Sequence, residues 1–403
     1  MPCSPNHDIE IWRQPNQKMS FLEKLRSTRA PEANLIILDD IFPHLLSAFR
    51  IAEFNAYLSR FEKAFAYSTA KAFPAVGDYR SFPEVLDEYL AVYPQFEGRV
   101  FRLGRKLPKA QLIYFVFLHN AGYFMNLLKS SRSPFVFTLY PGFRLGQPDS
   151  EALLRKVCSL PNLAKVITTQ TLSHEYLLEF LEPERVEFIY GGVFPSDRLA
   201  TSGVLRKYYQ KDKGTFDICF VAFKYMLQGI DKGYDVFVEV AKELCRLHDD
   251  IFFHVVGPFD RLDIDVSDLK GRIKFYGIRQ TEFFPQFYAG MDLILAPTVP
   301  FVLRPGAFDG FPTGCCIEAG LCGVAVFCTD VLKLNVAFKE GEEIVIVPRD
   351  VQGICELIER NYRDYDNLVQ LARRGQEAFR VAFGLANQLE KRLKILDEYL
   401  PRT

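Results

Sequence analysis

The sequence lacks a surplus of charge of either sign. Its 49 Lys and Arg balance 50 Asp and Glu, which leaves a formal net charge of −1 over 403 residues. No overall field would recruit nucleic acid or an anionic membrane, so any anion must be bound locally. The chain also lacks the run of ~20 apolar residues that a membrane span needs. Its start, MPCSPNHDIE, lacks the basic and then apolar layout of a signal peptide. We therefore expect a cytoplasmic protein with no nucleic-acid partner.

Cysteines in metal-binding or redox spacing are missing as well. The nine cysteines are odd in number and form no Cys-x-x-Cys pair. We interpret them as small core residues of a protein in a reducing compartment. No Gly-x-Gly-x-x-Gly follows the first apolar run, so a dinucleotide-dependent oxidoreductase fits the sequence poorly.

Short apolar runs recur along the chain with helical segments between them. The first, Asn34–Asp39, contains Leu-Ile-Ile-Leu without a polar break, which is typical of a parallel strand buried on both faces. Such alternation predicts an α/β protein, and 403 residues suffice for two domains. We expect a tail or short docking segment in 1–30, a first domain in 31–200, a second in 201–385, and a terminal helix in 386–403 that packs back toward the first domain.

The stretch 308–330, FDGFPTGCCIEAGLCGVAVFCTD, reads as a loop, a helix, a turn at Gly323 and a strand. The helix N-terminus would offer backbone N–H groups near Gly310, Thr313 and Gly314 to a phosphate or a sugar hydroxyl. Glu318 lies one turn inside this helix, and an ionised carboxylate accepts two hydrogen bonds from vicinal hydroxyls. An ordinary helix–strand unit with a surface glutamate is the alternative reading.

This stretch resembles the nucleotide-sugar-binding segment of retaining glycosyltransferases of family 4, the glycosyl transferases group 1. The family carries two Glu separated by seven residues, then Ala, Cys-Gly-x-Pro-Val and Asp. Glu318 matches the second Glu, and the family's later positions are matched by Ala319, Cys322, Gly323, Val326 and Asp330. Asp309 lies nine positions before Glu318, where the family spacing is eight. Either the loop is one residue longer and Asp309 still reaches the sugar, which we favour, or the role of the first acid has lapsed.

Other segments resemble the same family in the same order. Lys224 and Lys232 resemble its Gly-Arg and Lys-Gly pair, which holds the nucleotide diphosphate, with Lys224 in the Arg position. His119 follows an apolar run where the family commonly has a His that touches the transferred sugar. Gly191–Val193 resembles the family's hinge, and Tyr288–Asp292 its Tyr-Ala-x-Ala-Asp.

The resemblance implies the GT-B fold, in which two Rossmann-like domains face each other across a cleft, with a C-terminal helix that crosses back. It implies catalytic roles for four residues: His119, Asp309, Lys224 and Lys232. It implies donor binding by five more: Glu318, Gly310, Phe311, Thr313 and Gly314. On the acceptor side, which the first domain would form, we expect Arg50, Tyr140 and Arg144.

By resemblance the chain is a retaining glycosyltransferase of hexosyltransferase type, active in polysaccharide biosynthesis. It would use a UDP- or GDP-sugar as co-substrate, with no cofactor and no metal. The acceptor would be a glycan or a lipid-linked saccharide, through which the protein would touch a membrane peripherally. Two alternatives stay open: a catalytically idle binding or scaffold subunit that keeps the fold, and a sugar-nucleotide epimerase.

Overall fold

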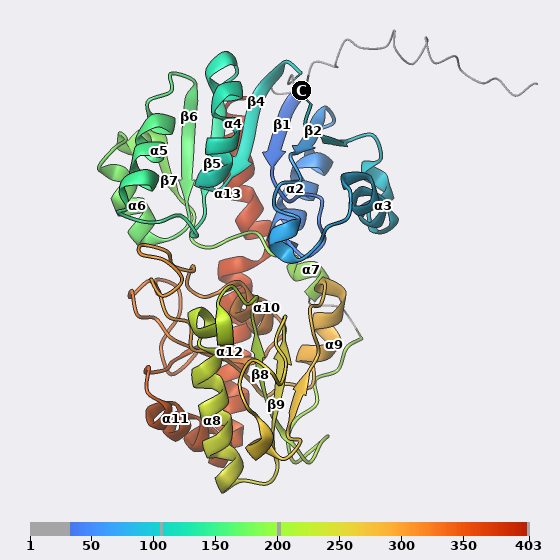
Figure 1. The fold of residues 1–403 in the computed structure, drawn as a ribbon, viewed down its shortest axis with the longest axis vertical. Coiled ribbons are helices and arrows are strands. Elements are labelled where there is room, and N and C mark those ends of the chain that lie inside the picture. Colours follow the sequence, from blue (N-terminus) through green and yellow to red (C-terminus); the bar gives the residue numbers. More distant parts are fainter. Residues whose placement is uncertain (1–32, 105–107, 200–202, 401–403) are drawn as a thin grey trace, which may run out of the picture.

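The computed structural model describes residues 33–104, 108–199 and 203–400, which form two lobes, one above the other in Figure 1. The tail expected in residues 1–30 lies outside these ranges. Each lobe is built around its own parallel sheet. Every helix within the described ranges is too short or too polar to span a membrane.

The first lobe contains a seven-stranded sheet in the order β3-β2-β1-β4-β5-β6-β7. Every neighbouring pair in it is parallel. The strands are β1 Ala33–Asp39, β2 Ala64–Ser68, β3 Val100–Arg102, β4 Ala110–Val116, β5 Phe135–Leu139, β6 Leu163–Thr168 and β7 Val186–Phe188. The helices between them are α2 Ala48–Arg60, α3 Phe82–Val92, α4 Leu118–Ser130, α5 Pro148–Cys158 and α6 Thr171–Leu178.

The second lobe contains a six-stranded parallel sheet in the order β10-β9-β8-β11-β12-β13. A short helix, α7 Ser196–Leu199, precedes it. The strands are β8 Phe216–Val221, β9 Ile251–Val256, β10 Ile273–Phe275, β11 Leu293–Ala296, β12 Ala325–Cys328 and β13 Val345–Ile346. The helices are α8 Tyr234–Leu247, α9 Phe284–Tyr288, α10 Gly314–Leu321, α11 Val351–Arg363 and α12 Tyr365–Phe383.

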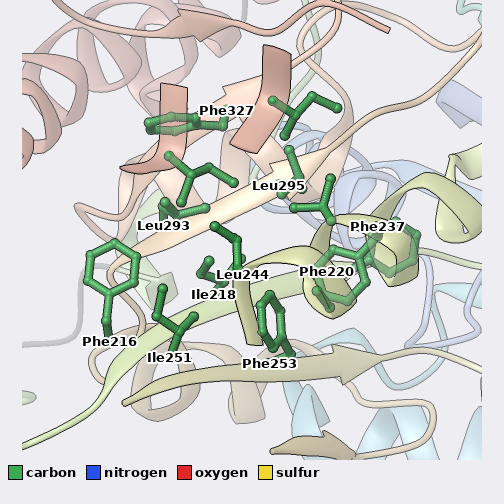
Figure 2. Packing of buried hydrophobic residues seen from close by; sticks show 14 of the residues in the cluster. Phe216, Ile218, Phe220, Phe237, Leu244, Ile251, Phe253, Leu293, Leu295 and Phe327 are labelled. Carbon is green, nitrogen blue, oxygen red and sulfur yellow. The ribbon is translucent and has the colours of Figure 1, made fainter. Parts of the chain in front are cut away.

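Alternate residues of the second sheet feed separate hydrophobic clusters. Figure 2 shows one cluster, in which residues of β8, β9, β11 and β12 pack with Phe237 and Leu244 of α8. Neighbouring strand residues such as Ile294 and Val326 belong to another cluster, shared with α10 and with Phe379 of α12. Both faces of the sheet are thus covered, as the unbroken apolar runs of the sequence predict.

The last helix, α13 Leu385–Asp397, returns to the first lobe. Gly384 interrupts the helical conformation between α12 and α13. Beyond it, Ile395, Leu396 and Leu400 pack into the hydrophobic core of the first lobe. In Figure 1 this red helix lies among the blue and green elements of that lobe. The expectation of a helix that crosses back is confirmed.

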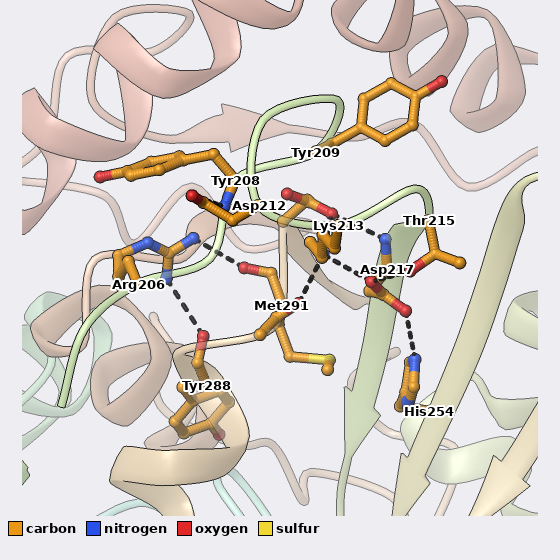
Figure 3. A network of polar contacts seen from close by, with 12 residues as sticks. Arg206, Tyr208, Tyr209, Asp212, Lys213, Thr215, Asp217, His254, Tyr288 and Met291 are labelled. Atoms are coloured by element: carbon orange, nitrogen blue, oxygen red, sulfur yellow. Dashed lines mark hydrogen bonds and ion pairs between the residues drawn. The ribbon is translucent and has the colours of Figure 1, made fainter.

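A buried polar network fastens the segment between the lobes to the amino ends of the second sheet (Figure 3). Lys213 Nζ lies 2.5 Å from Asp217 and 2.6 Å from Asp292. Arg206 donates to the carbonyls of Met291 and Tyr288 at 2.7 and 3.1 Å. Asp292, the acid of the family-like Tyr288–Asp292 segment, therefore lies at the amino ends of the strands. Ligands of such sheets bind at the opposite edge, at the carboxyl ends.

The apolar run that precedes His119 is a strand only in part. Strand β4 ends at Val116, and α4 begins at Leu118 after Phe117, whose φ is +67°. His119 is therefore a residue of the first helical turn, close to the carboxyl end of β4.

Candidate active site

A cavity of about 660 Å³ lies between the two lobes. Its walls follow the carboxyl ends of strands from both sheets: Phe117 after β4, Tyr140 after β5, Thr169 after β6, Ala222 after β8 and Thr298 after β11. Ligands of open α/β sheets bind at this edge, and the volume suits a small molecule.

The loop before α10 forms one side of the cavity. Gly310, Thr313 and Gly314, three of the residues expected to bind the donor, line it. Thr313 is the N-cap residue of α10, but its hydroxyl lies 3.1 Å from the sulfur of Cys315 instead of accepting from the helix backbone. The first N–H groups of α10 are therefore left for other acceptors.

Phe311 lies apart from the other residues expected to bind the donor. Its ring is 5% exposed in the core, and it is not part of the cavity lining. Its N–H donates to Gln170 Oε1 at 3.2 Å, and its carbonyl accepts from Gln170 Nε2 at 3.3 Å. Both backbone groups thus connect the loop before α10 to the first lobe.

Glu318 lines the cavity from α10 and is 9% exposed. Burial raises the pKa of its carboxyl group to about 7, because the charged form loses hydration. Hydroxyl groups of a ligand that donated to this carboxylate would favour its charged form and lower the pKa again.

Lys232 and Asp309 meet in the cavity. Lys232 Nζ lies 2.5 Å from Asp309 Oδ2 and 3.9 Å from the carboxylate of Asp231. Burial lowers the pKa of Lys232, but the charge and the hydrogen bond of Asp309 outweigh it and leave the pKa above its ordinary value. The ammonium group is therefore charged, and Asp309 lines the cavity beside it.

Lys224 does not reach the cavity. Its ammonium group lies 2.5 Å from Asp263, and the lining contains its neighbours Phe223 and Tyr225 instead. A second cation does line the cavity, but it is Arg279, which follows the end of β10. Sequence reasoning missed Arg279, although its place after a strand end was a usable signal.

His119 lines the cavity from the first lobe, with 46% of its side chain exposed. Its Nε2 lies 3.0 Å from Asp40 Oδ2, so the ring N–H donates to this carboxylate. Burial raises the pKa of Asp40, but hydrogen bonding from His119 and the charge of Arg50 outweigh it and lower the pKa. An ionised Asp40 thus orients the ring.

The three acceptor-side candidates separate in the structure. Tyr140 lines the cavity, and its hydroxyl donates to Glu53 at 2.9 Å. Arg50 is 8% exposed and donates to Asp39 at 3.0 Å, outside the cavity lining. Arg144 also lies outside the lining and donates to Asp149 at 2.7 Å.

A buried ion pair lies behind Tyr140, and the sequence did not predict it. Glu53 of α2 and Arg392 of α13 are both fully buried, with Nε 3.7 Å from Oε1. Arg392 also donates to the carbonyl of Gly191, a lining residue in the family-like hinge, at 3.1 Å. Helical spacing alone predicts Arg392 to be a solvated residue, so no local signal marks it.

No group of three or more His, Cys, Asp or Glu side chains suited to hold a metal ion occurs among the described residues. The residues that line the cavity offer carboxylates, a lysine, an arginine and backbone amides. This set is suited to hold an anionic ligand that also carries hydroxyl groups.

Comparison with known proteins gives this cavity a context. Residues 217–364 match the model of the family described as glycosyl transferases group 1. No protein with curated annotation matches the sequence. HepE of Anabaena, in a crystal structure with UDP-glucose, is 17% identical with a TM-score of 0.66, over 91% of this chain and 99% of that chain.

Two further solved structures share the fold. The sucrose-phosphate synthase of Thermosynechococcus elongatus is 15% identical with a TM-score of 0.61, over 90% of this chain and 99% of that chain. A glycosyltransferase from Rickettsia africae is 14% identical with a TM-score of 0.62, over 92% and 100%. The chain thus has the GT-B fold, and residues 217–364 of its second lobe match the glycosyl transferases group 1 model, in agreement with the resemblance of its sequence.

Proposed function

We propose that this protein is a retaining glycosyltransferase that needs no metal and moves a sugar from a UDP- or GDP-sugar to a hydroxyl of a glycan or other acceptor. One observation carries the proposal: Glu318, the Lys232–Asp309 pair and His119, which come from three separate segments of the chain, line one cavity. HepE of Anabaena has been crystallised with UDP and with UDP-glucose, which supports uridine as the first nucleotide to test.

Glu318 would bind the ribose of the donor. Its carboxylate is 9% exposed, and the pKa of about 7 reflects the loss of hydration. Two ribose hydroxyls would restore the hydrogen bonds that burial removes, and the ionised form accepts both at once. Donor binding should therefore favour the ionised carboxylate.

Lys232 and the first amides of α10 would stabilise the leaving diphosphate. Negative charge grows on that group as the bond to the sugar breaks, and preorganised cations and N–H groups are usually the largest catalytic contribution. Lys232 is bound to Asp309 at 2.5 Å in the described structure. A phosphate would compete for the ammonium group and release Asp309 to accept from a hydroxyl of the sugar.

His119 would contact the same sugar from the opposite wall, oriented by Asp40 at 3.0 Å. In the transfer, the bond from the anomeric carbon to the phosphate oxygen breaks, and a bond to the acceptor oxygen forms on the same face. The acceptor's proton passes to the oxygen of the departing phosphate, so no separate base is required.

A binding experiment tests the donor site. We would titrate UDP, GDP, ADP, dTDP and CMP into the full chain without metal and follow thermal unfolding. Ligand at a hundredfold excess over Kd should stabilise the protein by ~2.7 kcal/mol. Glu318→Ala and Lys232→Met should abolish the response. Lys224→Met is the matched control, because Lys224 lies outside the lining, and it should keep the response.

An idle binding subunit is the second candidate, and the position of Lys224 outside the cavity favours it. Such a subunit would bind a nucleotide but release none from a nucleotide sugar. An epimerase would convert the sugar while it stays on the nucleotide. Incubation with the UDP-sugar whose nucleotide binds, together with a panel of saccharides that offer acceptor hydroxyls, followed by separation of products, distinguishes all three. A transferase would release UDP and glycosylate an acceptor, an epimerase would change the sugar on the nucleotide, and an unchanged donor would contradict both enzymes.

A further inference from the structure

The charges of the cavity are confined to one wall. Five charged side chains occur among the described residues that line it, and all come from the second lobe: Asp231, Lys232, Arg279, Asp309 and Glu318. The wall from the first lobe carries mostly apolar and aromatic side chains, namely Leu45, Leu46, Ala48, Phe49, Phe117, Tyr140 and Pro141, and three polar ones, His119, Thr169 and Gln170. The two walls thus suit chemically different ligands.

The cation nearest to the apolar wall is already paired with carboxylates. Arg50 lies behind it, with its guanidinium 4.5 Å from the ring centre of Phe117 and its Nε bound to Asp39. Asp40 lies 3.6 Å from the same guanidinium, so two carboxylates surround this one cation. Such a cluster would repel a phosphate or a carboxylate placed on the wall.

The remaining cations on this side give an anion no direct contact either. Arg144 pairs with Asp149, and Lys71 lies 4.4 Å from the ring centre of Tyr123; neither belongs to the lining. An anionic acceptor would therefore lose hydration on this wall without gaining a charged partner from it.

Few polar atoms of the wall are available to a ligand. The Tyr140 hydroxyl already donates to Glu53, and the Gln170 amide pairs with the backbone of Phe311. His119 uses one ring nitrogen for Asp40 and keeps the other. The Thr169 hydroxyl also belongs to the lining and has no hydrogen-bond partner among the described residues, but its oxygen is buried. The half-exposed His119 is therefore the polar group of this wall best placed to orient a hydroxyl beside a predominantly apolar surface.

The apolar surface continues outward on the second lobe. Leu303 lines the cavity and is 37% exposed, and Phe301 and Val302 beside it are 42% and 39% exposed. Their loop is joined to the first lobe by a hydrogen bond of 2.9 Å from the Leu145 N–H to the Gly306 carbonyl. Leu303 and its exposed neighbours thus offer a long ligand further apolar contact beyond the cavity.

We propose that the first-lobe wall binds an uncharged amphiphilic acceptor, whose alkyl chain packs on Leu45, Leu46, Phe49 and Phe117 and leaves over Leu303, and whose head group presents a hydroxyl to His119. This proposal rests on the proposed glycosyltransfer and names the acceptor class of that site. Each methylene that the wall buries should raise affinity roughly fourfold.

Alkyl glucosides test the acceptor class directly. Methyl, butyl and octyl β-glucoside, each below its micellar concentration, would be titrated into the full chain in the presence of UDP, with binding followed by calorimetry. Affinity should rise at least tenfold from methyl to octyl. Octyl glucuronide, which adds one carboxylate, should bind at least tenfold more weakly than octyl glucoside. Equal affinity along the chain series, or tighter binding of the glucuronide, would overturn the proposal.

A wall variant separates specific binding from adsorption of the alkyl chain. Leu46→Asp changes a half-buried lining residue and should lower the affinity for octyl glucoside at least tenfold. The affinity for UDP should stay within twofold of the wild type, and the thermal unfolding temperature should stay within 3 °C of it. Val302→Asp tests the rim in the same way. Octyl binding that neither variant changes would mean adsorption and refute the proposal. Failure of UDP itself to bind would instead contradict the donor site.

Discussion

The ion pair between Glu53 of α2 and Arg392 of α13 allows a quantitative prediction. Both side chains are fully buried, and the guanidinium also donates to the carbonyls of Gln388 and Gly191, at 3.1 Å each. Glu53 in turn accepts from the hydroxyls of Tyr57 and Tyr140, each at 2.9 Å, and from Tyr114. The pair therefore joins the returning helix, the hinge and one wall of the cavity.

Arg392→Leu should be strongly destabilising. Leucine removes the partner charge and leaves Glu53 as a carboxylate in the core, which costs about 3–5 kcal/mol when a buried pair is broken. Equilibrium urea unfolding, followed by fluorescence and circular dichroism, measures the loss. Addition of Glu53→Gln should recover at least ~1 kcal/mol, because the amide oxygen still accepts from the tyrosines but carries no charge to strand.

The same two helices supply the control. Arg60 of α2 lies 3.6 Å from Asp397 of α13, but their side chains are 52% and 43% exposed. An exposed pair contributes about 0–1 kcal/mol, so Arg60→Leu should change stability little. Equal losses in Arg60→Leu and Arg392→Leu would refute the reasoning, because burial would then not decide the cost. So would an Arg392→Leu protein that Glu53→Gln fails to improve.

Three further predictions concern the donor loop and α10. Burial holds the pKa of Glu318 near 7 against an ordinary 4.5, so its contribution to stability is fully present below pH 4.5 and is lost as pH rises to 7. Relative to Glu318→Gln, wild type should lose about 2 kcal/mol of unfolding free energy between pH 5 and pH 8, and parallel urea profiles would contradict this. Gly320→Ala would place a Cβ 2.3 Å from Phe379 Cδ2, so it should cost about 1–3 kcal/mol by overpacking, and an unchanged urea midpoint would count against this contact. Gln170→Leu leaves the N–H and carbonyl of Phe311 unpaired and should increase the radius of gyration in solution scattering without UDP, whereas an unchanged radius would mean that this contact does not hold the lobes together.

The sequence by itself determined the two sheets and the loop, helix and strand of 308–330. Unbroken apolar runs predict buried parallel strands wherever they occur, because both faces of such a strand must be covered by other elements. The order of loop, helix, turn and strand in 308–330 was also local information, since the turn at Gly323 requires a positive φ, which is 78°. The structure agrees, with α10 at Gly314–Leu321 and β12 at Ala325–Cys328.

Only the tertiary structure decided which polar side chains reach the cavity. Lys224 and Lys232 look alike in the sequence, but Asp263 binds the first outside the cavity, and the second lies inside it. Arg50, like Lys224, pairs with a carboxylate outside the cavity, that of Asp39. A long charged side chain adopts the direction in which it finds a partner, and that partner here comes from a distant segment.

The buried Arg392 gives the clearest case of this limit. The sequence predicts a terminal helix, which is right, but nothing in it marks Arg392 as buried. Its burial results from the return of α13 to the first lobe, where Glu53, at the other end of the chain, compensates its charge. Each helix or strand must bury one face, so its hydrophobic pattern can be recognised in the local sequence. The partner of a buried charge depends instead on which elements the fold brings together.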